Sequence, residues 1–446
     1  MSFWRKICCC FAGDDINVGD NTRLLPKSEK SDPATQKLWS PYIVFIYGVG
    51  PTDLHLKRIP DSFGKQGIIK IACGSDHVLF LTEVNYVLSA GNNTYGQCAR
   101  DPKLLEENKS NEEIVSESRI NEKLSAFNIP GFKIVDIAAG AYHSLILVKE
   151  EISNGDGVVM AFGHETGCGF LDREHRHIPT EVPLREKYQE SVNSIFAGQM
   201  RSAAVLQSGK ILIWGEWFNG LKQREPKELQ FELPAGDSIK RISMGKMHAI
   251  LSTQSGRVYS VGDNTYGELG FPREITYKSA PGLIPYFKNL PVLDVAAGAR
   301  HSVVLEESGK VFAFGDNSEG QCGIDANRSY EPQEIETRGM LGESDVTTRF
   351  IFCGDSHSAL LTSEGDLFAW GDNTAGRLGI KSGNSIFRPR MVDELIGRNI
   401  CAVGLGGTFS SIIVGPYSGS LQAKTLNILN QSSGVENSSF QLSTKE

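Results

Sequence analysis

The sequence lacks the motifs that mark common catalytic sites. It has no G-x-x-x-x-G-K-[ST] phosphate-binding loop and no G-x-S-x-G nucleophile motif, and its glycines follow a repeat instead. Its nine cysteines include no C-x-x-C pair and have no metal-like spacing with histidine. We therefore predict a protein with no catalytic residues, no cofactor and no metal site.

A block of basic residues and a long apolar run are missing too. The net charge is −8 at neutral pH, which disfavours nucleic acid as a partner. No apolar stretch reaches the length of a membrane span. Several cysteines stand where sister repeats have small apolar residues, which is typical of buried thiols in a reducing compartment. We expect a cytoplasmic, monomeric chain.

What the sequence does contain is a repeated phrase. GDNTYGELG at 262–270 returns in close copies that begin at Gly91, Gly315 and Gly371, each after a short run of alternating apolar residues. Alternation that ends in Gly-x-Asn-x-x-Gly predicts a strand that runs into a tight loop, where glycine takes a positive φ and asparagine tolerates one.

A second pattern, a glycine three residues before a histidine and then an apolar run, precedes each phrase. We expect each histidine to hydrogen-bond backbone at the start of an inner strand, and each glycine to allow close packing near a narrow axis. One histidine per repeat cannot converge on a metal ion. Arg201 and Phe409 replace the histidine in two repeats. The five intact pairs are Gly74 with His77, Gly140 with His143, Gly245 with His248, Gly298 with His301, and Gly354 with His357.

The number of repeats predicts an all-β, seven-bladed β-propeller. Each repeat has two halves, the glycine-histidine half and the half in which a strand ends in the phrase or its equivalent. Each half occurs seven times with a period of about 52 residues, and all-strand repeats of this size are typical of propellers. The first strand half, near 42–47, and the last glycine half, near 400–414, are both unpaired. We predict that these N-terminal and C-terminal strands pair and close the ring, which protects the sheet edges.

These patterns divide the chain into three parts. We predict a propeller over 42–416, interrupted by a charged insertion at 101–130, and disordered tails at 1–41 and 417–446. The insertion is interpreted either as a solvated segment or as a partner-binding projection.

The N-terminal tail carries two signals for membrane association. Cys8, Cys9 and Cys10 stand beside basic and aromatic residues, which predicts S-acylation; the alternative is a tail that happens to hold cysteines. Asp20 with Leu24 and Leu25 resembles an acidic dileucine sorting signal. Together they predict a peripheral location on endosomal or lysosomal membranes.

The third repeat departs most from the consensus. It has Arg201 in place of the histidine, and Glu216, Trp217 and Phe218 where its sisters have a polar loop. Clustered aromatic residues beside an arginine are typical of interface anchors, so we predict that these four residues bind a partner. The alternative is repeat drift, with the rings folded onto the neighbouring blade.

The two patterns together resemble the regulator of chromosome condensation repeat family, over roughly residues 42–414. The resemblance implies a seven-bladed propeller closed by an N-terminal strand. The family's founding member is a guanine-nucleotide exchange factor for the small GTPase Ran and docks on histones. Relatives regulate other small GTPases or trafficking, or form modules of ubiquitin ligases. This chain lacks the basic tail of a chromatin binder.

The resemblance therefore implies a protein-interaction propeller that regulates a small GTPase, as an exchange factor. A scaffold or trafficking adaptor without exchange activity is the alternative, because one fold hosts many functions.

Overall fold

The structure is a computed structural model of the whole chain, and it describes residues 43–48, 55–58, 67–100, 125–151, 155–337 and 346–415. The predictions for both tails, including Cys8, Cys9, Cys10, Asp20, Leu24 and Leu25, lie outside the described residues. So does most of the insertion. Its last residues are described: β6 (Ser125–Phe127) is a strand, and Ile129 beyond it is buried.

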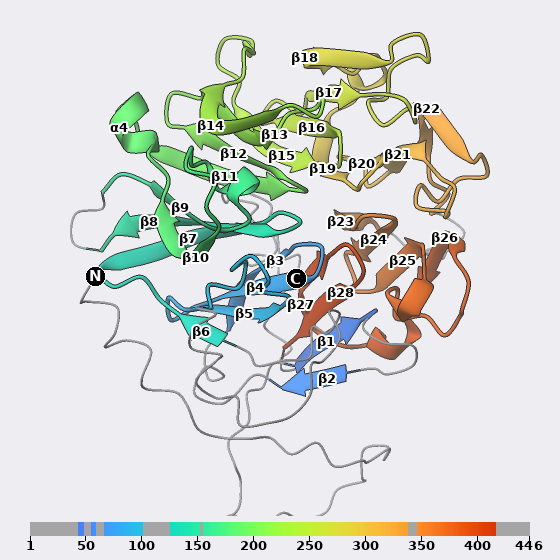
Figure 1. Cartoon of the computed structure of the whole chain (residues 1–446). Helices are drawn as coiled ribbons and strands as arrows, with labels where there is room; N and C mark the ends of the chain where they lie inside the picture. Colours follow the sequence, from blue (N-terminus) through green and yellow to red (C-terminus); the bar gives the residue numbers. More distant parts are fainter. Residues whose placement is uncertain are drawn as a thin grey trace, which may run out of the picture. The chain divides into compact units, whose positions relative to one another are not determined.

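The described strands form seven antiparallel sheets of four strands, numbered here as blades 1 to 7 (Figure 1). Blade 1 contains β3 (Ile68–Cys73), β4 (His77–Thr82), β5 (Val87–Gly91) and β6. Blade 2 contains β7 (Phe132–Ala139), β8 (His143–Glu150), β9 (Val158–Gly163) and β10 (Arg176–Glu181), with helices α3 (Glu165–Cys168) and α4 (Leu184–Tyr188). Blade 3 contains β11 (Val192–Gly198), β12 (Arg201–Leu206), β13 (Ile211–Glu216) and β14 (Lys222–Glu228).

The remaining blades repeat this order. Blade 4 contains β15 (Ile239–Met244), β16 (His248–Thr253), β17 (Val258–Asp263) and β18 (Tyr277–Leu283), then η3 (Pro285–Phe287). Blade 5 contains β19 (Val292–Ala297), β20 (His301–Glu306), β21 (Val311–Asp316) and β22 (Arg328–Glu334). Blade 6 contains β23 (Thr348–Cys353), β24 (His357–Thr362), β25 (Leu367–Gly371) and β26 (Ile386–Met391), with η4 (Thr374–Gly376) and η5 (Asp393–Leu395). Blade 7 contains β27 (Ile400–Leu405), β28 (Ser410–Val414), β1 (Ile43–Tyr47) and β2 (His55–Arg58).

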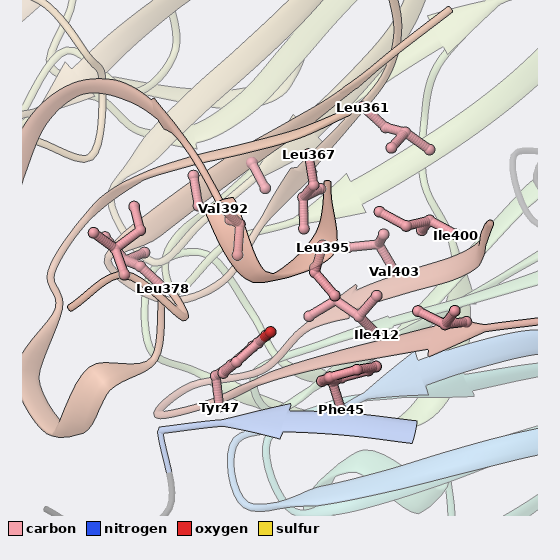
Figure 2. Close-up of a cluster of buried hydrophobic side chains, with 14 of the residues drawn as sticks. Phe45, Tyr47, Leu361, Leu367, Leu378, Val392, Leu395, Ile400, Val403 and Ile412 are labelled. Carbon is pink, nitrogen blue, oxygen red and sulfur yellow. The ribbon is translucent and has the colours of Figure 1, made fainter. Parts of the chain in front are cut away.

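The predicted closure is confirmed. In blade 7, β1 lies between β2 and β28, so two strands from the N-terminal side complete the sheet that the C-terminal strands begin. Phe45 pairs with Ile412 in the register, and Tyr47 follows Phe45 into the same buried cluster (Figure 2). This cluster also contains Leu378 and Val392 of blade 6, so the closing strand is held by side-chain packing as well as by backbone bonds.

The innermost strands contact one another in a closed cycle from β3 through β27 and back to β3. The second strand of blades 1 to 6 is buried along most or all of its length, as in β16 and β20. Burial on both faces explains why these strands are continuous apolar runs in the sequence. The outer strands of blades 2 to 6 are more exposed, and each contains a proline at a shift in register, which discourages edge-to-edge pairing. These prolines are Pro179, Pro226, Pro281, Pro332 and Pro389.

The repeated phrase forms the predicted loop, but its asparagine has another role. Gly262 has a φ of +114°, and a Cβ there would lie 2.3 Å from the carbonyl oxygen of Met247. Asn264 does not adopt a positive φ. Its buried side chain donates to the carbonyls of Phe271 and Ile275 and accepts from the Leu269 amide, so it ties the loop together from inside.

No helix among the described residues is long and apolar enough to span a bilayer.

Candidate interaction face

One face of the propeller carries two kinds of loop. Because neighbouring strands alternate in direction, the chain reaches this face between the first and second strands and again between the third and fourth. The glycine-histidine motif forms the first kind and the Gly-Asp-Asn phrase the second. We call this side the loop face. The residues predicted to bind a partner lie in its blade 3 loops.

The motif histidines link neighbouring blades through side chains, a role that was not predicted. Each Nε2 atom lies within hydrogen-bonding distance of a serine Oγ in the next blade. The five pairs are His77 with Ser144 (2.9 Å), His143 with Ser202 (2.8 Å), His248 with Ser302 (3.0 Å), His301 with Ser358 (2.8 Å), and His357 with Ser410 (3.1 Å). The predicted packing role of the glycines is seen at Gly74, where a Cβ would lie 2.2 Å from the His77 ring.

The partners of the serines define the histidine tautomer. Ser144 Oγ donates to the Gln97 carbonyl and Ser202 Oγ to the Gly167 carbonyl, so each hydroxyl must accept its hydrogen bond from histidine. The histidine proton is therefore on Nε2, while His143 Nδ1 is buried without a partner. Burial lowers the pKa of His143 to about 3, so the ring is neutral.

Where a blade has no histidine at this position, the next blade has no serine to receive it. Blade 3 has Arg201 in place of the histidine, and blade 4 has Ala249 in place of the serine. Blade 7 has Phe409 in place of the histidine, and blade 1 has Val78 in place of the serine. Phe409 and Val78 pack in one buried cluster. The residue at the histidine position therefore varies together with the residue that it faces in the next blade: histidine occurs with serine, and a replaced histidine occurs with a replaced serine. This signal was present in the sequence and was missed.

Arg201 lies inside the boundary between blades 3 and 4. It is 1% exposed, donates from Nη1 to the Gly245 carbonyl (2.9 Å) and from Nη2 to the Lys246 carbonyl, and its guanidinium lies 4.7 Å from the centre of the Phe218 ring. Burial lowers the pKa of Arg201 to about 10, and Glu216 opposes that shift, so the side chain stays charged at neutral pH. Phe218 is also 1% exposed. The partner-binding prediction therefore narrows to Glu216 and Trp217, which are half-buried.

An apolar surface covers this buried pair. Trp217 packs beside Phe218 with ring centres 5.8 Å apart, and its amide donates to the carbonyl of Leu221, whose side chain is 67% exposed. Met247 Sδ lies 3.7 Å from Arg201 Nη2, and Tyr277 is 38% exposed. We call Trp217, Leu221, Met247 and Tyr277 the blade 3–4 patch. These residue types are common in interface cores.

A second group of side chains gathers at the loops of blades 1 and 2. The ring of Tyr95 lies 5.7 Å from Tyr142, 4.7 Å from His164 and 4.9 Å from His175, between ring centres. Burial and the neighbouring His175 lower the pKa of His164. The sequence did not point to this cluster, because its members come from different repeats.

An ion pair joins this loop to blade 3. Arg224 on β14 donates through Nε and Nη2 to the two carboxylate oxygens of Glu165, at 2.7 and 3.2 Å. The hydrogen bond from Arg224 holds the pKa of Glu165 below its ordinary value. The loops of blades 2 and 3 are thereby fixed relative to each other.

The innermost strands line an axial channel of about 290 Å³. At the loop face, Gln199 Nε2 donates to Asp355 Oδ1 over 2.7 Å, which joins blades 3 and 6. Burial raises the pKa of Asp355. Lys70 pairs with Asp136, and Arg241 lies 3.5 Å from Asp294. The described residues contain no group of side chains arranged to hold a metal ion.

Residues 46–412 match the family profile described as RCC1-like domain. Among curated proteins, the chain is 28% identical over 290 residues to the human probable E3 ubiquitin-protein ligase HERC6, covering 63% of this chain and 28% of that protein. It is 25% identical to the Arabidopsis thaliana ultraviolet-B receptor UVR8, covering 74% of this chain and 70% of the receptor. The chain thus spans little more than a quarter of HERC6, and it covers more of the plant receptor.

Among solved structures, Prp20p from Saccharomyces cerevisiae superimposes with a TM-score of 0.68 and 21% identity, covering 88% of this chain and 95% of that one. That structure is described together with the binding properties of Prp20p to Gsp1p and histones. At this identity the likeness is one of fold.

Proposed function

Since the chain belongs to the RCC1-like domain family, we propose that its propeller regulates a small GTPase as a guanine-nucleotide exchange factor. The observation that carries the proposal is the blade 3–4 patch, an aromatic and apolar surface in which Trp217 stands where four sister blades have an asparagine. Trp217 provides its largest ring and Leu221 its most exposed side chain. The family resemblance supplies the class of partner, and the patch supplies a place for it.

Exchange needs no covalent chemistry from the propeller. A protein that binds the nucleotide-free GTPase more tightly than the loaded one accelerates nucleotide release by that difference in affinity. The blade 3–4 patch is suited to this role because Arg201 and Phe218 support it rigidly from below, through bonds to blade 4. A rigid surface loses little conformational entropy when it binds.

Binding to a panel of small GTPases tests the proposal. Each GTPase is prepared without nucleotide and loaded with GDP or a GTP analogue, and captured by the full-length chain. We expect selective capture of one nucleotide-free GTPase, and a loss of at least tenfold in affinity for Trp217→Ala, as for a central aromatic anchor. Phe387→Ala is the control, because Phe387 is 47% exposed on β26 of blade 6. Capture of the GTP-loaded form alone would instead identify a scaffold or adaptor recruited by the GTPase.

We propose further that the chain acts at an endosomal or lysosomal membrane, held there by acylation of Cys8, Cys9 and Cys10 and sorted through Asp20, Leu24 and Leu25. Two or more acyl chains give stable anchoring, whereas one gives only reversible binding. The triple Cys→Ser variant should lose incorporation of an alkyne-labelled fatty acid and leave the membrane fraction. An unchanged membrane fraction would contradict the anchor.

A further inference from the structure

We propose that His164, His175, Arg173 and Lys222, which we call the donor cluster, form a docking site for an acidic segment of a partner protein. The donor cluster shares no residue with the blade 3–4 patch, although Leu221 of that patch lies beside it, and the proposal does not depend on the identity of any GTPase. All four residues belong to loop-face segments of blades 2 and 3. The proposal rests on hydrogen-bond donors without partners, on local charge and on exposed leucines beside them.

The two imidazoles offer fixed donors. His164 Nδ1 accepts from the Thr166 amide, and His175 Nδ1 accepts from the Glu165 amide, both over 3.2 Å. A neutral imidazole with an accepting Nδ1 carries its proton on Nε2. The ring centres are 4.9 Å apart, and within the described chain neither Nε2 has a hydrogen-bond partner. Two adjacent N–H groups are therefore available to an acceptor from outside.

The neighbouring charges favour an anion. Lys222 and Arg173 are exposed, and neither forms an ion pair with a described residue. The nearby carboxylates are engaged, because Arg224 holds Glu165 and Arg176 holds Asp172. The exposed Glu174 lies 3.8 Å from the same Arg176.

The charge of this region contrasts with that of the whole chain. Among residues 164–176 with Glu216, Lys222 and Arg224, four cations face four carboxylates, so this region is neutral, whereas the chain as a whole carries −8. Lys222 and Arg224 lie close enough to add to the lowering of the pKa of His164, which burial and His175 dominate. The donor cluster itself thus contributes two cations, Arg173 and Lys222, and no carboxylate to an acidic protein, and these charges would steer and orient an acidic partner.

The surroundings favour a peptide over a free ion. Leu171, at 71% exposed, and Leu221, at 67%, lie in the two loops that carry the donors. Tyr95 and Tyr142 close one side of the imidazole pair. A segment with acidic residues next to an apolar one could place carboxylates on the donors and its apolar side chain against a leucine.

Fluorescence anisotropy with the full-length chain tests the site. The probe is a fluorescein-labelled peptide of glutamates around one leucine, compared with the same peptide in which glutamine replaces every glutamate. We expect binding of the glutamate peptide only, weakening with added salt. Lys222→Glu should reduce the affinity roughly tenfold or more, because it reverses a charge at the site. Lys227→Glu makes the same charge change further along β14 and should leave the affinity within about twofold.

A second pair of variants tests the imidazole donors. His175→Ala should weaken binding, and His175→Gln should restore much of it, because the amide also offers an N–H donor. Equal binding of the two peptides, or equal effects of Lys222→Glu and Lys227→Glu, would overturn the proposal. Binding to anionic lipid vesicles in preference to the peptide, with the same dependence on Lys222, would overturn the assignment to a peptide.

Discussion

His143 in blade 2 donates from Nε2 to Ser202 Oγ in blade 3 over 2.8 Å, and the same serine donates to the Gly167 carbonyl. The two bonds connect the second strands of adjacent blades to each other and to the phrase loop between them. Five such links recur around the ring. Together with the bonds from Arg201 to blade 4, they connect blades 1 to 7 in order through buried polar side chains, whereas blades 7 and 1 meet through the apolar Phe409 and Val78.

Removing one serine should destabilise the propeller. Ser202→Ala leaves the buried His143 Nε2–H without its partner, which costs about 1–3 kcal/mol, while the Gly167 carbonyl keeps its bond from Trp214 Nε1. Urea unfolding at neutral pH measures the change in free energy. Ser252→Ala is the matched control, because the buried Ser252 Oγ has no hydrogen-bond partner among the described residues, and its removal should be nearly neutral. Equal losses for both variants would contradict a linking role for Ser202.

Because Arg201 of blade 3 faces Ala249 of blade 4, we predict that substitutions at these two positions have coupled effects on the free energy of unfolding. Arg201→His alone should destabilise, because it loses the bonds to the Gly245 and Lys246 carbonyls and finds no hydroxyl at Ala249. Adding Ala249→Ser should recover part of the loss by supplying the partner that sister blades have. A double-mutant cycle should give a favourable coupling of about 1 kcal/mol. Additive effects would show that the two positions do not communicate.

Much of the fold was predictable because the repeat carries it. Each half of the repeat occurs seven times, and counting the two unpaired halves placed β1 beside β28.

The partners of side chains were not predicted, because they lie outside the motif in which a side chain appears. His143 and Ser202 are 59 residues apart. Reading one repeat at a time suggested a bond to nearby backbone, whereas comparing adjacent repeats would have found the serine. Phe218 and Arg201 looked like interface residues because their types are common there, yet both are buried. His164 and His175 come close only because a loop specific to blade 2 folds back beside Tyr95.

The linking histidines should make the protein sensitive to acid. Burial lowers the pKa of His301 to about 3, below the ordinary 6.5, so the unfolded chain binds a proton between these values while the folded one does not. Stability is therefore complete above pH 6.5 and falls as the pH decreases toward 3, by about 2 kcal/mol per histidine at pH 5. Asp294 and Asp355 act oppositely, because burial raises their pKa.

One variant isolates the contribution of a single histidine. His301→Gln keeps an N–H for Ser358 but cannot take up a proton. When the pH is lowered from 7.5 to 5, the natural protein should lose about 2 kcal/mol more free energy of unfolding than the variant does. Urea midpoints at the two pH values give this difference, in which any constant cost of the substitution cancels. A pH-independent difference would show that His301 is not buried as a neutral ring.

Glu268 should have the opposite dependence on pH. It is 1% exposed, and burial raises its pKa from 4.5 to about 7. Its Oε2 accepts from the Tyr266 amide (2.7 Å), as Gln97 Oε1 accepts from Tyr95 and Gln321 Oε1 from Glu319 in sister blades. Between these pKa values the folded chain holds a proton that the unfolded one has lost. Stability is therefore lost as the pH rises from 4.5 to 7.

Glu268→Gln reproduces the uncharged form that two sister blades already use. The substitution should stabilise the protein at pH 8 more than at pH 5, by roughly 2 to 3 kcal/mol, because the ionised carboxylate no longer has to be buried. Melting temperatures across this range measure the effect. The exposed Glu274→Gln is the control for loss of one negative charge, and it should follow the pH profile of the natural protein. If both variants change the profile alike, net charge and not burial accounts for the effect.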